Sequence, residues 1–319
     1  MGKCSVCRTH LNFSHRDELA KRLDLRRRSQ QWDVPGPLPG RLANSATAHP
    51  QGPQAIGLVR RSPQPVNALV RRIASSTLGL LPVRVQRGVA RGARWTLFPY
   101  SSYWRGTHEP LVQQTIENLG NGDILGWNCW DLGAHFGLYS IALALRCGPK
   151  GSVAAFEPNP ASFTRLERHR RMNGIPWLRT YQAAASDRTE TTELLTYGQT
   201  DTTSAHLFYE GETRNSECTP IAIRSLRLDE LAESGELRAP QFVKIDVEGH
   251  GHKALEGMKG TLAKSRPTLI VAFHSNLEVD GVLEILRALD YRWTPIAADP
   301  TPPKSMVGGD YLFTPLARA

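Results

Sequence analysis

The amino-acid sequence predicts an α/β fold with a doubly wound, mostly parallel sheet, preceded by a disordered tail. Strand and helix patterns alternate over the last two thirds of the chain, which is typical of a parallel sheet covered by helices on both faces. The charge is divided in the same way. Residues 1–105 carry 18 Lys and Arg against 4 Asp and Glu, a net +14, whereas residues 106–319 carry 21 against 26, a net −5. The part expected to fold is therefore acidic, although the whole chain of 319 residues has a net charge of +9.

The N-terminal third has the least regular sequence. Residues 1–65 are rich in Arg and scattered Pro and show no helix or strand periodicity, so we expect a basic, largely disordered tail with at most a short helix near Arg16–Arg28. Residues 66–110 are expected to lead into the main domain, residues 111–319. The first expected elements are a lead-in helix at Val66–Leu81, short strands at Val83–Gln86 and Arg94–Phe98, and a helix at Leu111–Leu119 that ends at Gly120.

The main domain continues as alternating strands and helices. Strands are expected at Trp127–Leu132, Ser152–Phe156, Leu178–Ala184, Phe242–Ile245 and Thr268–Phe273, helices at Leu138–Arg146, Pro160–Asn173, Lys253–Leu262 and Val279–Leu289, and a closing antiparallel pair at Tyr291–Ile296 and Tyr311–Thr314. The Thr-rich region 190–225 is expected to form a lid or edge strands. Ligands of such sheets bind beyond the C-terminal ends of the strands, so the functional residues are expected there.

The first main strand runs into the sequence WDLGAHFG, residues 130–137. Gly133 lets the backbone turn tightly and approach a ligand, and Gly137 opens the next helix, whose N-terminus favours an anionic group. The spacing lacks the third glycine of the dinucleotide-binding pattern, and Asp131 suits a cationic ligand better than a pyrophosphate. The loop is therefore either a cofactor site or only a tight turn between strand and helix.

Acidic residues follow two further strands. Glu157 ends the strand Ser152–Phe156, where a carboxylate can accept hydrogen bonds from a ribose diol; the alternative is a helix-capping acid. Asp246 and Glu248 follow the strand Phe242–Ile245. One of them can serve as a base or cofactor contact, and the other can hold a substrate, a metal ion or Lys244. The alternative here is an internal salt bridge with a helix cap.

Several blocks occur in a characteristic order: WRGTHEP (104–110), WDLGAHFGLYS (130–140), AAFEPNP (154–160), AAASD (183–187), SLRLDEL (225–231), and FVKIDVEG (242–249) with ALEG (254–257). Together they resemble the FkbM family of S-adenosylmethionine-dependent methyltransferases over about residues 84–296. The resemblance implies a class I methyltransferase (Rossmann-like) fold with a seven-stranded sheet whose last strand is antiparallel. It also implies S-adenosyl-L-methionine as cofactor and methyl transfer to a hydroxyl of a sugar, glycan or secondary metabolite.

The resemblance further implies roles for the matching residues. The expected cofactor contacts are Asp131, Gly133, Ala134 and Gly137 at the methionine and ribose, Glu157 at the ribose hydroxyls, Ala184, Ser186 and Asp187 near the adenine, and also Glu109 and Asp246. Methyl transfer requires an aligned acceptor oxygen and removal of its proton. Asp246 is the first candidate for the base and His274 the second, while Glu248 is expected to contact the acceptor or a metal ion. The acceptor itself is expected to be recognised by residues 190–225 and 99–110.

The chain departs from the family pattern near the expected crevice. Gly251 and Ala272 stand where family members commonly carry glutamates, which weakens the case for a metal-assisted mechanism, and no metal site is predicted. His250 and His252 lie at a helix start and are expected to be solvated.

Two other interpretations stay open. A nucleic-acid or polyanion-binding protein would use the basic tail and keep the sheet as a non-catalytic scaffold, but the main domain is acidic and the tail holds few aromatic residues. A degenerate family member would bind the cofactor without turnover. The sequence has five irregularly spaced cysteines, no apolar run of about 18 residues and no secretory signal, so a cytoplasmic location is expected, with a small-molecule or glycan acceptor and no nucleic acid.

Overall fold

The structure, a computed structural model, describes residues 81–97, 101–197, 206–207, 218–299, 301 and 303–317. All of them belong to one compact unit, Ser62–Ala319. The tail expected at residues 1–65 and its short helix lie outside the described residues, as does the lead-in helix except for Leu81.

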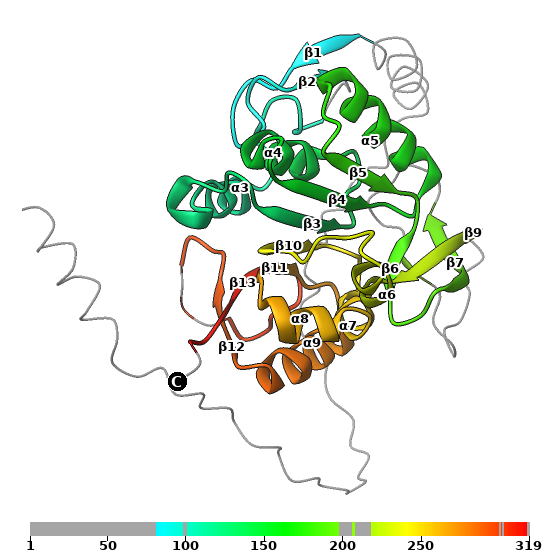
Figure 1. The fold of residues 1–319 in the computed structure, drawn as a ribbon, viewed down its shortest axis with the longest axis vertical. Coiled ribbons are helices and arrows are strands. Elements are labelled where there is room, and N and C mark those ends of the chain that lie inside the picture. The colour runs from blue at the N-terminus through cyan, green and yellow to red at the C-terminus, as the bar shows by residue number, and fades with distance from the viewer. Residues whose placement is uncertain are drawn as a thin grey trace, which may run out of the picture. The chain divides into compact units, whose positions relative to one another are not determined.

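A seven-stranded sheet forms the centre of this unit (Figure 1). Its strands, in spatial order, are β12 (Tyr291–Pro295), β13 (Asp310–Pro315), β11 (Thr268–Ala272), β10 (Phe242–Ile245), β3 (Asn128–Leu132), β4 (Ser152–Phe156) and β5 (Leu178–Tyr181). The pairs from β11 to β5 are parallel, and β13 is antiparallel to both of its neighbours. This order, with its antiparallel last strand, is the class I methyltransferase fold that the sequence predicted.

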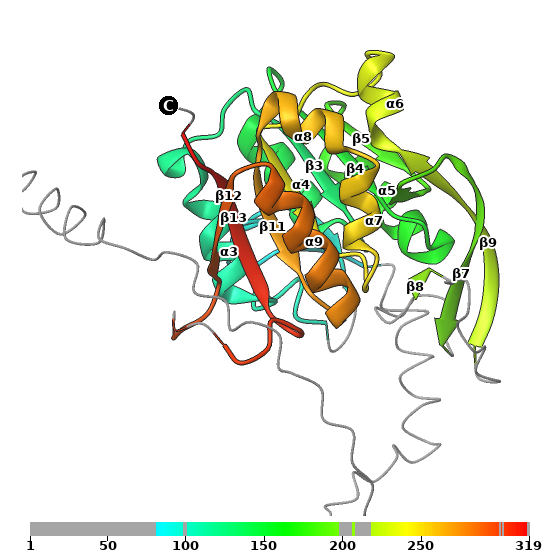
Figure 2. The ribbon, with the colours of Figure 1, turned by 90° about the horizontal axis from the view of Figure 1, so that it is seen from below.

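Helices cover both faces of the sheet (Figures 1 and 2). One face carries α3 (Pro110–Glu117), α4 (Leu138–Cys147) and α5 (Pro160–Asn173), with a 3-10 turn at Leu119–Gly122, and the other carries α6 (Leu228–Glu233), α7 (Gly251–Glu256), α8 (Lys259–Ser265) and α9 (Asn276–Ala288). Successive strand residues point to opposite faces, so Cys129 joins the core under α4 and Trp130 joins the core on the other side. Within the described part of the chain, no helix has the length and apolar character needed to span a bilayer.

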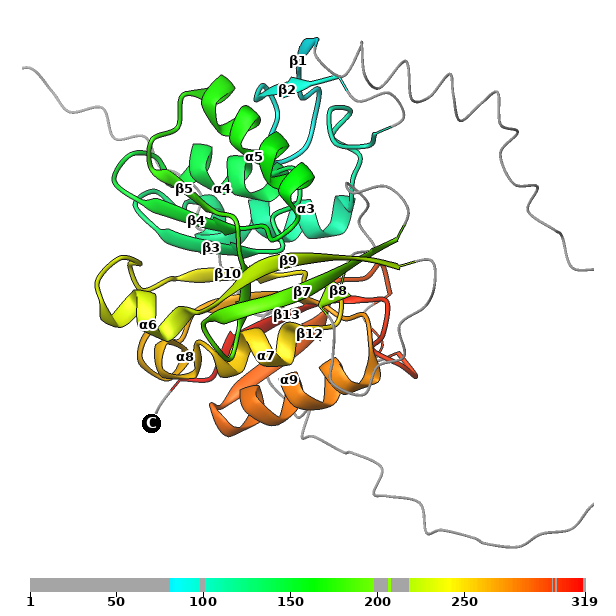
Figure 3. The same cartoon turned by 90° about the vertical axis from the view of Figure 1, so that its right-hand side faces the viewer.

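A second, smaller sheet lies beside the first (Figure 3). Its order is β6 (Ala184–Ser186), β9 (Cys218–Arg227), β7 (Glu190–Tyr197) and β8 (His206–Leu207). The described parts of region 190–225 therefore form strands, one of the two outcomes expected. β1 (Pro82–Arg84) and β2 (Arg94–Thr96) form a further antiparallel pair, in which β2 packs against α5. Their bounds are close to those of the two short strands that the sequence predicted.

Two of the expected elements were wrong because distant partners divide them. The strand expected at Leu178–Ala184 breaks after Tyr181, and β6 leaves the main sheet to pair in parallel with β9. The helix expected at Lys253–Leu262 breaks at Gly257, whose Cα faces the Ser186 carbonyl so closely that a Cβ would lie 1.8 Å from it. A new helix, α8, then starts where the Asp229 carboxylate accepts hydrogen bonds from the first-turn N–H groups of Gly260 and Thr261, at 2.9 and 2.8 Å.

Candidate active site

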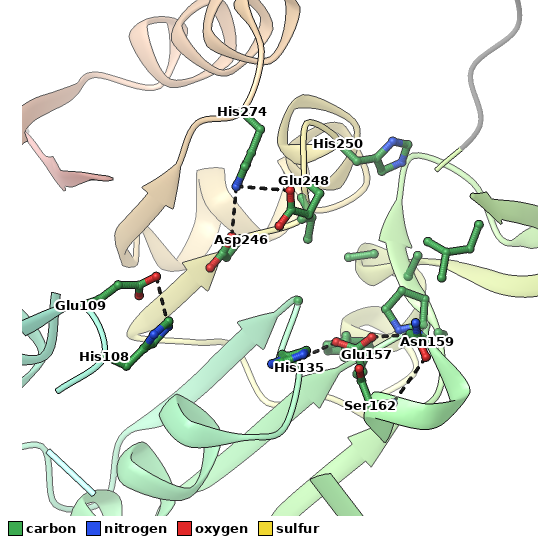
Figure 4. Close-up of a pocket in the computed structure, with 18 of the residues that line it drawn as sticks. His108, Glu109, His135, Glu157, Asn159, Ser162, Asp246, Glu248, His250 and His274 are labelled. Atoms are coloured by element: carbon green, nitrogen blue, oxygen red, sulfur yellow. Dashed lines mark hydrogen bonds and ion pairs between the residues drawn. The ribbon is translucent and has the colours of Figure 1, made fainter. Parts of the chain in front are cut away.

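A cavity of about 310 Å³ opens where β3, β4, β10 and β11 end (Figure 4). This is the sheet edge at which ligands of doubly wound folds bind. The lining residues are Tyr103, His108, Glu109, Gly133, His135, Phe156, Glu157, Pro158, Asn159, Ser162, Ala183, Ala184, Ala185, Leu194, Asp246, Val247, Glu248, His250 and His274. The cavity therefore collects side chains from four strand ends, from the segment before α3 and from the second sheet.

The structure brings part of the sequence-predicted set together. The expected residues that line the cavity are Glu109, Gly133, Glu157, Ala184, Asp246, Glu248 and His274, and those that lie outside its lining are Asp131, Ala134, Gly137, Ser186 and Asp187. Three of the latter already have side-chain partners. Asp131 is buried and accepts a hydrogen bond from Ser140, Ser186 contacts His250, and Asp187 pairs with Lys253 at 3.0 Å. Their contacts with a cofactor stay predictions.

The turn after β3 requires a glycine. Gly133 has a φ of +84°, and a Cβ on it would lie 1.8 Å from the backbone oxygen of Asp246. The parallel register pairs Leu132 with Ile245, so Gly133 and Asp246 leave the sheet side by side. Only a residue without a side chain lets the two strand ends approach this closely.

Glu157, at the end of β4, is held by backbone groups. Its Oε2 accepts a hydrogen bond from the N–H of His135 at 2.7 Å, and its Oε1 accepts one from the N–H of Asn159 at 2.8 Å. The residue is only 6% exposed. Burial raises the pKa of Glu157 to about 7, although the two N–H groups act in the opposite direction. Each oxygen keeps a lone pair for a further donor, such as a ribose hydroxyl.

The ends of β10 and β11 carry a cluster of charged groups. Oδ2 of Asp246 lies 2.7 Å from Nζ of Lys244, and its Oδ1 lies 3.5 Å from Nε2 of His274. The same Nε2 lies 3.7 Å from Oε2 of Glu248 (Figure 4). Lys244 is fully buried, yet Asp246 and Asp131 outweigh that burial and raise its pKa, so it stays an ammonium. Asp246 is therefore a carboxylate held between two basic side chains.

His274 is a cationic histidine. Its Nδ1 lies 3.6 Å from Oε2 of Glu278, a buried carboxylate on α9. Burial disfavours the imidazolium, but the contacts with Glu278, Glu248 and Asp246 prevail and raise the pKa of His274 to about 9. At neutral pH the ring is therefore protonated and neutralises the carboxylates around it.

Asp246, Glu248 and His274 also form the only group of three or more potential metal ligands among the described residues, with one ligand atom from each lying within 4.8 Å of the others. Such a set has the chemistry to hold a divalent cation. In the ion-paired arrangement described above, Lys244 and the His274 imidazolium neutralise the negative charge of Asp246 and Glu248.

The cavity wall also concentrates backbone strain. Glu109, His135 and Glu248 have φ values of 41°, 49° and 51°, in the left-handed region that residues with side chains seldom adopt. All three line the cavity. Strain of this kind persists where the surrounding structure fixes it, and it is frequent at functional sites.

The segment before α3 forms part of the cavity wall, as the sequence predicted for residues 99–110 and Glu109, but Tyr103, His108 and Tyr139 were not singled out. The hydroxyl of Tyr103 lies 2.9 Å from Nδ1 of His135, and Nε2 of His108 lies 3.2 Å from Oε1 of Glu109. The hydroxyl of Tyr139 donates to Oε2 of Glu109 at 2.7 Å. Although burial opposes ionisation, His108, Lys244 and Tyr139 lower the pKa of Glu109 to about 2. The motif WRGTHEP was the available signal for this wall, and it contains both His108 and Glu109.

The expectation that His250 is solvated was wrong. His250 is buried, lines the cavity and places its Nε2 3.0 Å from Oγ of Ser186. Burial lowers its pKa to about 4, so the ring is neutral. The contact joins residues that are 64 positions apart, and no local pattern could show it. His252 is half-buried.

The donor set fits a nucleoside cofactor with a positive charge. The tight turn at Gly133 lines the cavity at the sheet edge, and Glu157 presents two acceptor oxygens. Glu109, whose pKa is lowered to about 2, adds negative charge to the cavity wall, which attracts a cation and repels a pyrophosphate.

Comparisons with known proteins agree with this description. The family model "Methyltransferase FkbM domain" matches residues 131–293. The hexuronic acid methyltransferase AglP of Haloferax volcanii is 30% identical over 206 residues, which cover 61% of this chain and 75% of AglP.

Solved structures show weaker likenesses. The FkbM methyltransferase of Methylobacillus flagellatus has 17% identity and a TM-score of 0.40, covering 59% of this chain and 43% of that one. A putative rRNA methylase of Clostridium thermocellum has 9% identity and a TM-score of 0.42, covering 65% and 97%. The fold assignment depends on the strand order given above, and the family assignment on the family model and AglP. This chain belongs to the FkbM family of S-adenosylmethionine-dependent methyltransferases.

Proposed function

We propose that this enzyme transfers a methyl group to an oxygen atom of a sugar acceptor, a hydroxyl in the first instance. The observation that carries the proposal is the placement of His274, Asp246 and Glu248 across one cavity from Gly133 and Glu157. A base and a cofactor site then share one chamber, as methyl transfer to a hydroxyl requires. The similarity to a protein named hexuronic acid methyltransferase supports a sugar acceptor.

The cofactor is proposed to lie on the β3–β4 side of the cavity, which comprises Gly133, His135, Glu157 and Asn159. The turn at Gly133 forms the wall against which it lies, and the two oxygens of Glu157 accept hydrogen bonds from the ribose hydroxyls. Glu109, which is ionised, attracts the positive end of the molecule. When bound, S-adenosylmethionine supplies a methyl group on a sulfonium, from which an oxygen nucleophile can displace it in line.

The acceptor is proposed to lie on the β10–β11 side, which comprises Asp246, Glu248 and His274. We assign proton removal to His274, because Asp246 already holds Lys244 and His274 with its two oxygens. In its neutral form, His274 takes the hydroxyl proton on Nε2 as the oxygen bonds to the methyl carbon. The three carboxylates around the ring stabilise the imidazolium that forms.

A second candidate reaction is methyl ester formation on the carboxylate of a uronic acid. The observation that favours it is the charge of His274, which is an imidazolium at neutral pH and would anchor a carboxylate by a charge-assisted hydrogen bond. A carboxylate carries no proton to remove, so this reaction needs no base.

The two reactions differ in product and in pH dependence. The purified enzyme is incubated with S-adenosylmethionine and with oligosaccharides that end in glucose or glucuronic acid, and formation of S-adenosylhomocysteine is measured. Mild alkali hydrolyses a methyl ester and leaves a methyl ether intact. For a hydroxyl acceptor, kcat/KM rises with pH up to about 9 as His274 loses its proton; for a carboxylate acceptor it falls above about 9.

Cofactor binding is tested separately by calorimetry. Glu157→Ala is expected to weaken S-adenosylmethionine binding by at least about tenfold, because charge-assisted hydrogen bonds to the ribose are lost. If the wild type binds no S-adenosylmethionine and Glu157→Ala changes nothing, the proposed site is wrong. A protein that binds the cofactor but turns over no acceptor supports the degenerate-member interpretation instead.

A further inference from the structure

The buried acid Glu278 connects three parts of the β10–β11 side. It lies in the first turn of α9 and has no exposed surface. Its Oε1 accepts a hydrogen bond from the N–H of Gly251 at 2.8 Å, and its Oε2 accepts one from the N–H of His274 at 2.8 Å. The same Oε2 lies 3.6 Å from Nδ1 of His274. One carboxylate therefore joins α7, the end of β11 and α9.

Gly251 leaves the room that this carboxylate occupies. A Cβ at position 251 would lie 2.6 Å from Oε1 of Glu278, closer than real Cβ atoms approach their neighbours. A side chain at 251 and the Glu278 carboxylate in its present place therefore exclude each other. The sequence alone suggested that this chain lacks an acid near position 251, but an acid is present and comes from α9.

The ring of His274 presents one nitrogen to Glu278 and the other to the cavity. Nδ1 points to the buried carboxylate, and Nε2 points to Asp246 and Glu248, both of which line the cavity. When the ring loses one proton, Glu278 stabilises the tautomer that keeps hydrogen on Nδ1. The lone pair then lies on Nε2, the atom that faces the acceptor.

We propose that Glu278 is the positioning residue of His274: its buried carboxylate accepts a hydrogen bond from the N–H of His274 and faces Nδ1, and so fixes the ring with Nε2 toward the cavity. This inference rests on the proposed role of His274 in proton removal. The charged groups that face His274 are Glu278 from α9, Asp246 and Glu248 after β10, and Asp310 at the start of β13. The charge of His274 acts to lower the pKa of Asp310. Glu278 is the one of these four groups that is completely buried.

The test is Glu278→Gln in the full chain. The ring resonances of His274 are followed by NMR against pH and identified by their absence in His274→Gln. The expected result is a fall of about one pH unit or more in the pKa of His274, a tenfold loss of proton affinity, because a carboxylate in contact with the ring becomes neutral. The inflection of kcat/KM with pH moves by the same amount, and the dissociation constant of S-adenosylmethionine changes by less than about threefold.

Two further variants complete the experiment. Glu284→Gln removes an exposed acid from the same helix and is expected to leave the pKa of His274 and the pH profile unchanged. Gly251→Ala keeps the charge of Glu278 but forces its carboxylate to move, and is expected to change the His274 titration and the pH profile. It also provides a test if Glu278→Gln does not fold.

The outcomes separate the two proposals. If the pKa of His274 and the pH profile both stay at wild-type values in folded Glu278→Gln, or in folded Gly251→Ala when Glu278→Gln does not fold, Glu278 has no positioning role. If the pKa of His274 moves while the pH profile does not, Glu278 acts as inferred, but His274 is not the group that removes the proton.

Discussion

The two sides of the cavity hold their functional groups by different means. On the β3–β4 side, the carboxylate of Glu157 is fixed by two backbone N–H groups, and Gly133 contributes only the absence of a side chain. On the β10–β11 side, Asp246, Glu248 and His274 are held by one another and by two buried charges, Lys244 and Glu278. Backbone groups do not titrate, whereas the charges of a side-chain cluster depend on one another. We therefore expect the first side to recognise its ligand mainly by shape, and the second to respond as a unit to a change of charge in any of its members.

The largest effect is expected from Asp246→Asn, which tests whether the β10–β11 side acts as a unit. Lys244 is 2% exposed, and the substitution leaves its ammonium without its 2.7 Å partner. We expect kcat/KM to fall at least about 100-fold, because His274, the assigned base, loses the carboxylate that lies 3.5 Å from its Nε2. The free energy of unfolding should fall by about 3 kcal/mol, as for other broken buried ion pairs.

Initial rates and denaturant unfolding measure these two effects. Glu256→Gln is the matched control, because Glu256 and its partner Lys259 are both exposed and 3.4 Å apart, and it should change neither quantity appreciably. An Asp246→Asn enzyme with nearly wild-type rates would show that the cluster does not act as a unit.

The next effect tests the shape recognition of the β3–β4 side. Gly133→Ala places a Cβ against the Asp246 carbonyl oxygen at a positive φ, so the turn must move. We expect S-adenosylmethionine binding to weaken by at least about tenfold, since small displacements at a preorganised site cost this much or more. Gly92→Ala is the control, because its φ of +85° is nearly the same but nothing lies within 4 Å of the added Cβ. Calorimetry showing equal affinity for both variants would contradict the argument.

A smaller effect concerns the ionisation of the carboxyl group on the β3–β4 side. Glu157 has its pKa raised to about 7 by burial, so it is ionised above that pH and protonated below it. The ionised form is the better acceptor for ribose hydroxyls, and we expect S-adenosylmethionine affinity to fall by up to about tenfold per pH unit below pH 7. Calorimetry across pH 5.5–8 measures this dependence. Glu157→Gln should bind more weakly and should lose the dependence attributable to Glu157.

The smallest effect on methyl transfer is expected from His169, which lies outside both sides. Its Nδ1 donates to the Phe136 carbonyl at 2.8 Å, its Nε2 contacts Oγ1 of Thr96 at 2.8 Å, and its ring stacks on Trp95. Burial lowers the pKa of His169 to about 4. The unfolded chain takes up this proton near pH 6.5 and the folded chain only near pH 4, so stability is lost as the pH falls between these values, by up to about 3 kcal/mol.

Denaturant unfolding of His169→Gln measures this contribution. The variant should be less stable than the wild type at pH 8, and the difference should shrink toward pH 4. Its kcat/KM at pH 8 should stay within about twofold of the wild type, because His169 does not line the cavity. If His169→Gln loses much of its activity but none of its stability, His169 takes part in methyl transfer and the prediction is wrong.

Sequence reasoning succeeded where the signals are local. The strand Ser152–Phe156 and the helix Pro160–Asn173 have the expected bounds, because Pro160 starts the helix, Asn159 caps it and Gly174 ends it. Gly133, Glu157, Asp246 and His274 line the cavity because a parallel sheet brings its strand ends to one edge. Their cofactor and catalytic roles stay predictions.

The rest depends on contacts between distant segments. Tyr103 reaches the cavity from a loop that precedes the sheet by more than 20 positions, and Glu278 reaches His274 from the next helix. The sequence indicated the segment 99–110 as a whole, but neither residue type nor spacing marks Tyr103 within it or Glu278 as a partner of His274. The breaks inside two expected elements have the same origin, since β9 and Asp229 become neighbours of those segments only after folding.

The contact between Gly133 and the Asp246 carbonyl limits how the acceptor specificity of such an enzyme can change in evolution. Because the two strand ends touch without an intervening side chain, neither can be rebuilt without displacing the other. New acceptors must then be accommodated by parts of the wall that lie outside the parallel strands, such as Tyr103 and His108 before α3 and Leu194 on the second sheet. Divergence in specificity within this architecture should accordingly concentrate in those segments, while the chemistry at the sheet edge stays fixed.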